Sequence, residues 1–267
     1  MAVQDTLPDP NYKRFVDGTN DASGTTGPGF AQVKLTNDQK ILTSRTNSQR
    51  LLARAIVGQK WKIDINYNPM TQEEFAPVFA FLLEKQGPMN PFFVSLPQYR
   101  TWQNSSFNSF VTTFGTHGTW TPRVKAAVVA GKTEFILQAY DHSGGGIAPT
   151  PSQTASSHNG PVPGDMITFH QGAATLNMSG DATHSKAYLI TSVETTQNNK
   201  TESADSNIGA TEWRLNVSPP LVKNISQNLG IALYQPKVKV IMPQPLSTYT
   251  LNKNNLYSFN LKLEEYL

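Results

Sequence analysis

The stretch Trp61-Lys62-Ile63-Asp64-Ile65-Asn66-Tyr67 alternates apolar and polar side chains. A period of two residues is typical of a β-strand with one buried face. After Pro69, Thr71 stands three residues before Glu74, which is the spacing of a capping box at the start of a helix. The sequence therefore predicts a strand over residues 61–67, followed at once by a helix over residues 71–86.

The predicted helix has one apolar face, because its large apolar residues recur at helical spacing. Gly87-Pro88 ends the helix, and residues 92–96 form a short apolar run that indicates a second strand. Pro77 lies inside the helix and removes a backbone hydrogen bond, at a cost of roughly 3 kcal/mol unless the helix bends there. The expected core is this helix laid on a β-sheet, built from Trp61, Ile63, Ile65, Phe75, Val78, Phe79 and Leu82.

The composition favours a β-rich fold with many turns. Charged residues make up 15% of the 267 residues, well below the usual quarter, and the chain has 18 Gly and 18 Pro. The net charge of +3 and the lack of long basic runs disfavour nucleic-acid binding. Cysteine is absent, which excludes disulfides, thiolate metal sites and cysteine nucleophiles. No apolar run approaches membrane-spanning length, so we expect a protein that is soluble when made, with no membrane partner.

The first part of the chain predicts an arm and a polar strand pair. Residues 1–30 are rich in Pro and Gly and offer few apolar residues to bury, so we expect an extended N-terminal arm. The arm either lies on a neighbouring subunit or is a free tail. Strands are expected near 32–35, 40–44 and 49–56. Arg45, Arg50 and Arg54 would form either a positive ladder across a subunit contact or a solvated strand face.

A second β-rich region begins near Trp120. Strands are expected over 124–130 and 134–139, joined at Gly131-Lys132, and then near 166–169, 186–193, 212–217 and 237–242. Six short strands with long polar loops indicate a small barrel or sandwich. We therefore predict an inserted β domain over residues 121–246, which is tolerated because loop-closure entropy grows slowly with length.

The last segment returns to the alternating pattern of the first strand. Tyr257, Phe259, Leu261 and Leu263 share one face. Residues 247–267 are therefore expected to pair with the first sheet, so that 31–120 and 247–267 form one domain. The predicted fold class is mainly β, with one flanking helix and an inserted β domain.

No segment has the pattern of an active site. The histidines lack the spacing of metal ligands, although His142, His158 and an aspartate could be assembled into a site by the fold. Asp141-His142-Ser143 holds the residue types of a catalytic triad, but adjacent residues cannot supply its geometry. We therefore expect no enzyme activity, no catalytic residues, no metal and no cofactor. The five histidines are His117, His142, His158, His170 and His184.

Carbohydrate or receptor binding is the alternative function. Trp102, Trp120 and Trp213, with other loop aromatics, could stack on sugar rings. Hydrolysis would further need two carboxylates roughly 5–9.5 Å apart in a cleft, and the acidic residues of this chain are dispersed along the sequence. Trp102 and Trp120 could equally pack back onto their own domain.

Several segments together resemble the distal tail and lambda-like minor tail-tip proteins of tailed bacteriophages. The first are Arg45-Thr46-x-x-Gln49-Arg50, Gly58-Gln59-Lys60-Trp61 and Pro69-Met70-Thr71-x-Glu73-Glu74-Phe75-Ala76-Pro77. The later ones are Pro163-Gly164-Asp165-Met166-Ile167-Thr168-Phe169, Ser218-Pro219-Pro220-Leu221 and the alternating C-terminal strand. The likeness covers residues 45–97, 163–221 and 256–267.

The resemblance implies a tail-tube-like β-sandwich that forms a ring, typically a hexamer, at the tail tip. The implied partners are copies of itself, the tail tube protein, and baseplate hub or tail-fibre proteins, with DNA only passing through the lumen. The implied location is the virion, after assembly in the host cytoplasm. A cyclic head-to-tail ring needs two different complementary surfaces on each copy. The candidate interface residues are Arg45, Arg50, Arg54, Tyr257 and Phe259.

Overall fold

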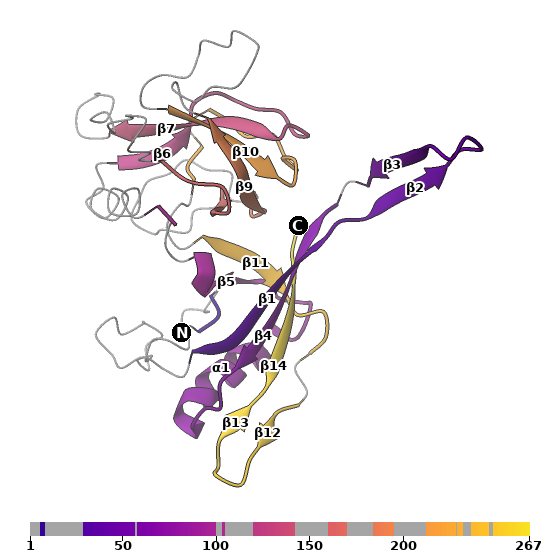
Figure 1. Ribbon diagram of the computed structural model, residues 1–267. Coiled ribbons are helices and arrows are strands. Elements are labelled where there is room, and N and C mark those ends of the chain that lie inside the picture. The colour runs from indigo at the N-terminus through magenta and orange to yellow at the C-terminus, as the bar shows by residue number, and fades with distance from the viewer. Residues whose placement is uncertain are drawn as a thin grey trace. The chain divides into compact units, whose positions relative to one another are not determined.

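A computed structural model defines the fold, and its elements divide into two compact units (Figure 1). Unit 1 comprises Met1–Ser95 and Lys239–Leu267, and unit 2 comprises Leu96–Val238. The fold is mainly β with one α-helix among the described residues, which confirms the predicted fold class. The structure describes residues 6–8, 29–56, 58–99, 103–104, 120–141, 160–169, 184–194, 212–227, 229–231, 236–245 and 248–267.

The sheet of unit 1 is built around the alternating stretch. It has five strands in the order β1-β4-β14-β11-β5. Their bounds are β1 Phe30–Asp38, β4 Lys60–Tyr67, β5 Phe92–Ser95, β11 Lys237–Ile241 and β14 Asn260–Glu265. Strand β4 is antiparallel to β1 on one side and to β14 on the other, with Ile63 opposite both Leu35 and Leu263. The predicted pairing of the C-terminal strand with the strand that begins at Trp61 is thus confirmed.

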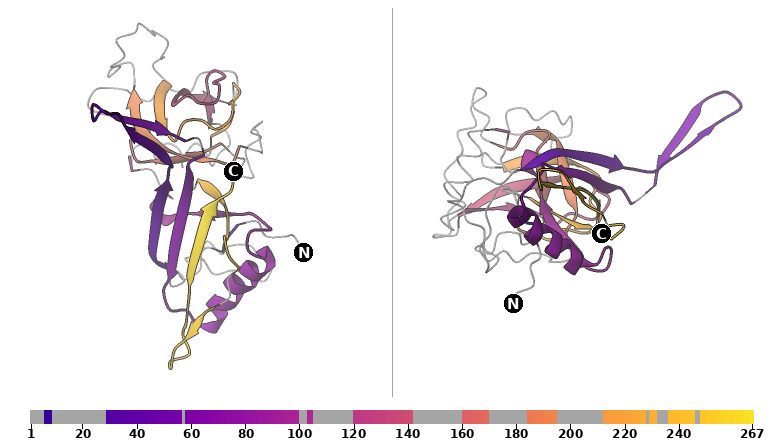
Figure 2. Two further views of the ribbon diagram at one scale, coloured as in Figure 1. Left: turned by 90° about the vertical axis from the view of Figure 1, so that its right-hand side faces the viewer. Right: turned by 90° about the horizontal axis from the view of Figure 1, so that it is seen from below.

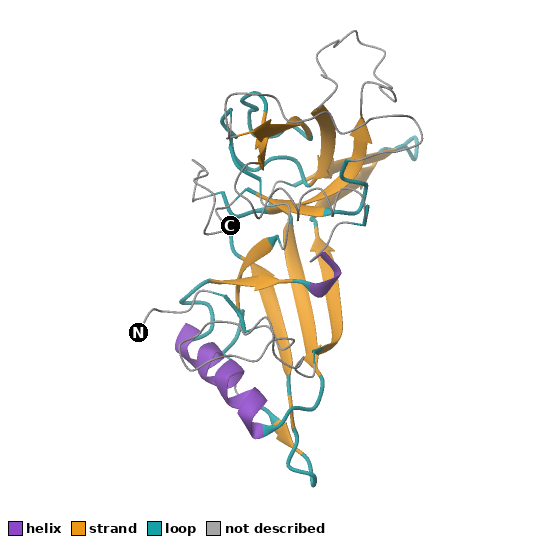
Figure 3. Ribbon diagram, turned by 90° about the vertical axis from the view of Figure 1, so that its left-hand side faces the viewer, coloured by secondary structure: helices purple, strands orange, loops and turns teal. Residues whose placement is uncertain are grey.

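The apolar side chains of β4 are buried, and the single helix lies alongside the sheet (Figure 3). Helix α1 spans Gln72–Lys85 and begins with the predicted capping box, in which the backbone amide of Thr71 donates to Glu74 Oε2 at 2.9 Å. The helix continues through Pro77. It ends where Gln86 adopts a left-handed φ of 51°. Gly87 also has a positive φ, and a Cβ there would lie 3.2 Å from Pro245, so this close approach favours glycine.

The buried face of α1 differs in part from the predicted one. Phe75, Val78 and Leu82 are buried as expected, whereas Phe79 is only half-buried. Phe81, which the periodicity did not select, is buried because its ring packs edge-on against Phe92 of β5 at 5.3 Å. Lys85 is also buried, with its ammonium 5.0 Å from the centre of the Phe81 ring. The buried face of the helix therefore includes Phe81, which meets β5.

Two short strand pairs extend unit 1. Strands β2 (Ile41–Arg45) and β3 (Leu51–Ala55) form one antiparallel pair, inserted between β1 and β4. Strands β12 (Thr250–Leu251) and β13 (Tyr257–Ser258) form the other, immediately before β14. Of the predicted N-terminal arm, only Thr6 to Pro8 and the last two residues are described. Thr6 pairs with Phe93 in parallel, and the buried Leu7 donates its amide to the Phe93 carbonyl at 2.8 Å.

Unit 2 contains a second five-stranded antiparallel sheet, in the order β6-β7-β10-β9-β8. Its strands are β6 Trp120–Val124, β7 Glu134–Asp141, β8 Met166–Thr168, β9 Ala187–Glu194 and β10 Glu212–Ser218, preceded by a short 3₁₀ helix, η1, at Pro97–Tyr99. The core of unit 2 is built on large buried side chains from this sheet and the segments that follow it, including Phe135, Leu137, Phe169, Tyr188, Ile190, Trp213 and Leu215.

Two strand predictions need correction. Strand β6 ends at Val124, where a strand over 124–130 was expected, because the chain then leaves β7 and Val128 bonds to Ile225. Strand β11 was expected in the inserted domain, but it joins the sheet of unit 1, with Val240 opposite Glu265. The chain thus returns to unit 1 at Lys239, earlier than the predicted residue 247, and it leaves unit 1 after Ser95.

Candidate interaction surface

The β2–β3 hairpin projects beyond the end of the unit 1 sheet (Figure 2). Each strand has five residues, which corresponds to about 17 Å of extended chain. The two strands pair only with each other among the described residues, so the hairpin forms a two-stranded sheet. An isolated two-stranded hairpin is marginally stable in water. Its conformation therefore depends on its own turn and on whatever surface binds it.

The turn of the hairpin is closed by hydrogen bonds around Thr46. The amide of Thr46 donates to the carbonyl of Arg50 at 3.0 Å, and the amide of Gln49 donates to the carbonyl of Thr46 at 2.8 Å. The hydroxyl of Thr46 also accepts from the amide of Arg50 at 3.2 Å. Gln49 adopts a left-handed φ of 63°, which reverses the chain. Among the described residues, these local contacts close the tip of the hairpin.

Both faces of the hairpin are apolar and exposed. Ile41, Leu42, Leu51 and Leu52 each expose half or more of their surface. The pairing places Ile41 and Leu51 on one face and Leu42 and Leu52 on the other, because directly opposed residues and residues two apart share a face. A solvated hairpin would normally keep one polar face. Contiguous exposed apolar surface of this kind marks a protein interaction site.

The hairpin is also uniformly basic. Lys40, Arg45, Arg50 and Arg54 lie between residues 39 and 60, and no acidic residue does. Arg45 lies opposite Leu51, and Arg54 lies opposite Leu42. Arg45 and Arg54 are therefore on different faces of the hairpin, because their positions in the register are three apart. Each face instead combines leucine with one arginine.

The candidate interface residues near the C-terminus divide between the core and the surface. Phe259 is 8% exposed, and its ring stacks on Tyr67 at 4.4 Å and meets Phe75 edge-on at 5.6 Å. The structure therefore assigns Phe259 to the core of unit 1. Tyr257 is half-buried and stacks on Phe75 at 4.5 Å.

Tyr257 belongs to an aromatic patch, which we define as Phe79, Tyr249, Leu251 and Tyr257. Tyr249 lies 5.5 Å from Phe79 and 5.6 Å from Tyr257 between ring centres, and 48% of its surface is exposed. Leu251 lies directly opposite Tyr257 in the β12–β13 pair and is exposed to the same extent. The patch is thus aromatic and partly open to solvent.

The residues considered for chemistry do not converge on a site in the described part of the chain. His184 is buried, with its Nε2 at 2.9 Å from the hydroxyl of Tyr188, which itself accepts from the amide of Val222. The other four histidines lie outside the described residues. Within the described ranges, no three His, Cys, Asp or Glu side chains are grouped as metal ligands. No helix in those ranges is long and apolar enough to cross a membrane.

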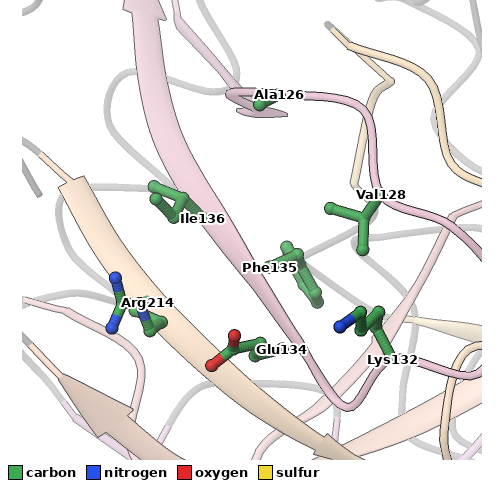
Figure 4. A pocket seen from close by; sticks show the side chains of 7 residues that line it. All are labelled: Ala126, Val128, Lys132, Glu134, Phe135, Ile136 and Arg214. Carbon is green, nitrogen blue, oxygen red and sulfur yellow. The ribbon is translucent and has the colours of Figure 1, made fainter. Parts of the chain in front are cut away.

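A shallow hollow in unit 2 offers little for a ligand (Figure 4). It lies beside β7 and β10, and Lys132, Glu134, Phe135 and Arg214 are among the residues that line it. Its volume of about 190 Å³ is below the roughly 300–1,000 Å³ of small-molecule sites. Arg214 is buried and lies 3.5 Å from Glu194. The hollow is therefore a surface feature of the sheet rather than a formed pocket.

Of the three tryptophans considered for sugar stacking, Trp213 is the one whose side chain the structure describes. Trp213 is 1% exposed and lies in the core of unit 2, so its ring faces are covered by protein. Trp102 and the side chain of Trp120 lie outside the described residues. The described part of the chain thus offers the hairpin and the aromatic patch as its two distinctive surfaces.

Comparison with known proteins matches the region that carries the hairpin. Residues 7–99 match the family model described as distal tail protein pb9, A domain, N-terminal. This range contains β1 to β5, the hairpin and α1. No curated protein matches the sequence. The chain therefore carries, over residues 7–99, the N-terminal part of the A domain of a tailed-bacteriophage distal tail protein, and it is a structural component of the virion tail.

Proposed function

We propose that this chain forms a ring, as a hexamer, at the distal end of the phage tail and joins the tail tube to the baseplate hub or the tail fibres. The observation that carries the proposal is the hairpin, which lies inside the family match and exposes apolar side chains on both faces. Such a hairpin suits a subunit whose working state is an assembly. Its role is to make contacts, with no turnover, and DNA passes through the lumen of the ring.

A ring also constrains the surfaces of each copy. Cyclic head-to-tail assemblies place a different patch of one subunit against its complement on the next. The chain carries a basic apolar hairpin and, elsewhere in unit 1, a partly exposed aromatic patch. Unit 2, which interrupts unit 1 between Ser95 and Lys239, is proposed to be an insertion that faces outward from the ring.

Native mass spectrometry of the purified full chain tests the ring. The expected result is a closed oligomer of six 29.4 kDa chains. A strict monomer at micromolar concentration would contradict the proposal. Labelling the protein in intact particles and imaging them by electron microscopy tests the location, and a label found along the tail or at its head-proximal end would contradict the assignment to the tip.

A further inference from the structure

We propose that the outer edge of β5 is a binding site for an extended strand, and that residues 6–8 of the same chain, the N-terminal segment, are its resident occupant. Strand β5 stands at the end of the strand order of the unit 1 sheet, with β11 as its neighbour (Figure 1). On the other side of β5, Thr6 pairs with Phe93 in parallel. This inference concerns one copy of the chain and does not rest on the proposed ring.

The N-terminal segment contacts β5 through backbone and side chain. The amide of Leu7 donates to the carbonyl of Phe93 at 2.8 Å. The Leu7 side chain is 5% exposed, and Pro8 beside it is buried as well. In strand addition to a sheet edge, backbone hydrogen bonds supply affinity, and pockets for alternate side chains supply specificity. We therefore expect the edge of β5 to select a segment with an apolar side chain at the position of Leu7, because a charge buried there would be costly.

Pro8 ends the sheet beyond the N-terminal segment. The amides of neighbouring residues in an extended chain point to opposite sides, and the amide of Leu7 points to β5. The next position is therefore one whose amide would point away from β5, and proline has no N–H to donate there. Proline at such positions is one of the means by which proteins prevent an edge strand from pairing with another chain. The N-terminal segment thus occupies β5 and offers a poor template for a further strand.

The chain that follows is long enough for the N-terminal segment to bind its own copy. Strands β1 and β5 are the two outer strands of the five-stranded sheet, so four strand spacings, or about 19 Å, separate them. A chain the length of residues 9–28 spans at most roughly 66–72 Å when fully extended. The N-terminal segment and β1 can therefore hold opposite edges of one sheet, and no second copy is needed to supply the occupant.

Peptide binding tests the site. A fluorescent peptide of residues 1–12 should bind to a chain that lacks residues 2–8, and its affinity for the full chain should be at least tenfold lower, because the N-terminal segment already fills the site. N-methylation of the Leu7 amide removes the donor to Phe93, and Leu7→Asp places a charge in the buried position. Each change in the peptide should weaken binding at least tenfold. The matched control is a Leu7→Met peptide, which should bind within threefold of the natural one. Fluorescence anisotropy measures all of these affinities.

Disulfide trapping in the full chain tests the occupant, because the natural chain has no cysteine. The double variant Thr6→Cys with Phe93→Cys places two thiols at paired positions. On oxidation it should form an internal disulfide, seen as a monomer that migrates faster on a non-reducing gel and loses about 2 Da in mass. The matched control is Thr6→Cys with Lys34→Cys, because Lys34 is exposed on β1 at the opposite edge of the sheet. The control should form no internal disulfide.

Several results would overturn the proposal. Equal affinity of the peptide for the full and the shortened chain would place its binding elsewhere. A shortened chain that keeps its helix signal in circular dichroism but binds no peptide would show that the edge of β5 is not a strand-binding site. Loss of that signal would show that the N-terminal segment is an integral part of the fold and not a separable occupant. Disulfide-linked dimers in place of the internal disulfide would assign the occupant to another copy. None of these results bears on whether the full chain forms the proposed ring.

Discussion

The side chain of Glu265 accepts a hydrogen bond from the backbone amide of Trp61 at 3.1 Å, although 204 residues separate the two in sequence. Glu265 is fully buried, and Trp61 is 6% exposed. The contact fixes the end of β14 against the start of β4 and so joins the two segments of unit 1.

Replacing Glu265 by Ala should destabilise the protein. The variant leaves the Trp61 amide without this buried acceptor, and the expected loss is about 1–3 kcal/mol in the free energy of unfolding. Urea denaturation measures it. The neighbouring Glu264→Ala is the control, because Glu264 pairs with Lys60 at 2.8 Å near the surface and its loss should cost less than about 1 kcal/mol. Equal losses in the two variants would contradict this account.

Phe259→Ala should be more damaging than any change in the aromatic patch. The Phe259 ring fills the space between Tyr67 and Phe75, so its removal leaves a cavity and should cost about 3–5 kcal/mol. Leu251→Ala, at a largely exposed position on the neighbouring strand pair, should change stability by no more than about 0.5 kcal/mol. Chemical denaturation of both variants measures the two losses in the free energy of unfolding. If Phe259→Ala cost no more than Leu251→Ala, the Phe259 ring would not be part of the core.

Replacing residues 41–55 by a two-residue turn should leave the monomer folded. The side chains described in this segment are exposed, so little intrachain packing is lost. We expect the melting temperature to change by only a few degrees, whereas assembly should be abolished. Thermal unfolding measured alongside native mass spectrometry separates the two effects. A variant that unfolds would show that the hairpin stabilises its own chain.

Asp165 accepts hydrogen bonds from two backbone amides, and we predict that its contribution to the free energy of unfolding depends on pH. Its two carboxylate oxygens accept from the amides of Gln103 and Val162 at 3.2 and 2.9 Å. Asp165→Asn can satisfy only one of these amides and should cost about 1–3 kcal/mol. Burial raises the pKa of Asp165, with the two amide hydrogen bonds opposing the shift.

The raised pKa sets the direction of the pH dependence. Between the ordinary value of 3.8 and the raised pKa, the folded chain holds this proton more tightly than the unfolded chain. The contribution of Asp165 to stability therefore falls as the pH rises through that window. Because asparagine does not titrate, the loss in the free energy of unfolding caused by Asp165→Asn should become smaller as the pH rises above 3.8 through the raised pKa. A loss in the free energy of unfolding that instead grows as the pH rises would contradict the raised pKa of Asp165.

Excision of unit 2 tests the insertion. Joining Ser95 to Lys239 through a short Gly-Ser linker keeps all five strands of the unit 1 sheet except the first two residues of β11. The shortened chain should keep its helix signal in circular dichroism and unfold cooperatively. Loss of that signal would show that unit 1 depends on unit 2 to fold.

The sequence predicted the fold best where one face of an element meets a single neighbour. The alternation over 61–67 identified a buried strand, and Thr71 with Glu74 marked the start of α1. Burial of Phe81 could not be read from periodicity, because it depends on Phe92, which approaches from β5. The end of β6 depends likewise on a bond from Val128 to Ile225, almost a hundred positions later in the chain.

The arrangement of residues on the candidate interaction surface could be predicted only in part. The arginines of the hairpin were recognised as interface candidates, but their division between two faces follows from the register, which places Arg54 opposite Leu42. The sequence also could not show that Phe259 is buried while Tyr257 and Tyr249 are partly exposed, because alternation gives the side of a strand and not what covers that side.

The position of β14 between β4 and β11 bears on how the chain is made. The strand that joins the two parts of this sheet begins at Asn260, whereas β4 ends at Tyr67. A nascent chain therefore cannot complete the sheet of unit 1 until β14 has been synthesised, long after the hairpin has left the ribosome. A product that stops before β12 would lack both the complete sheet and the β12–β13 pair, so the hairpin would be present on a chain whose own sheet is unfinished.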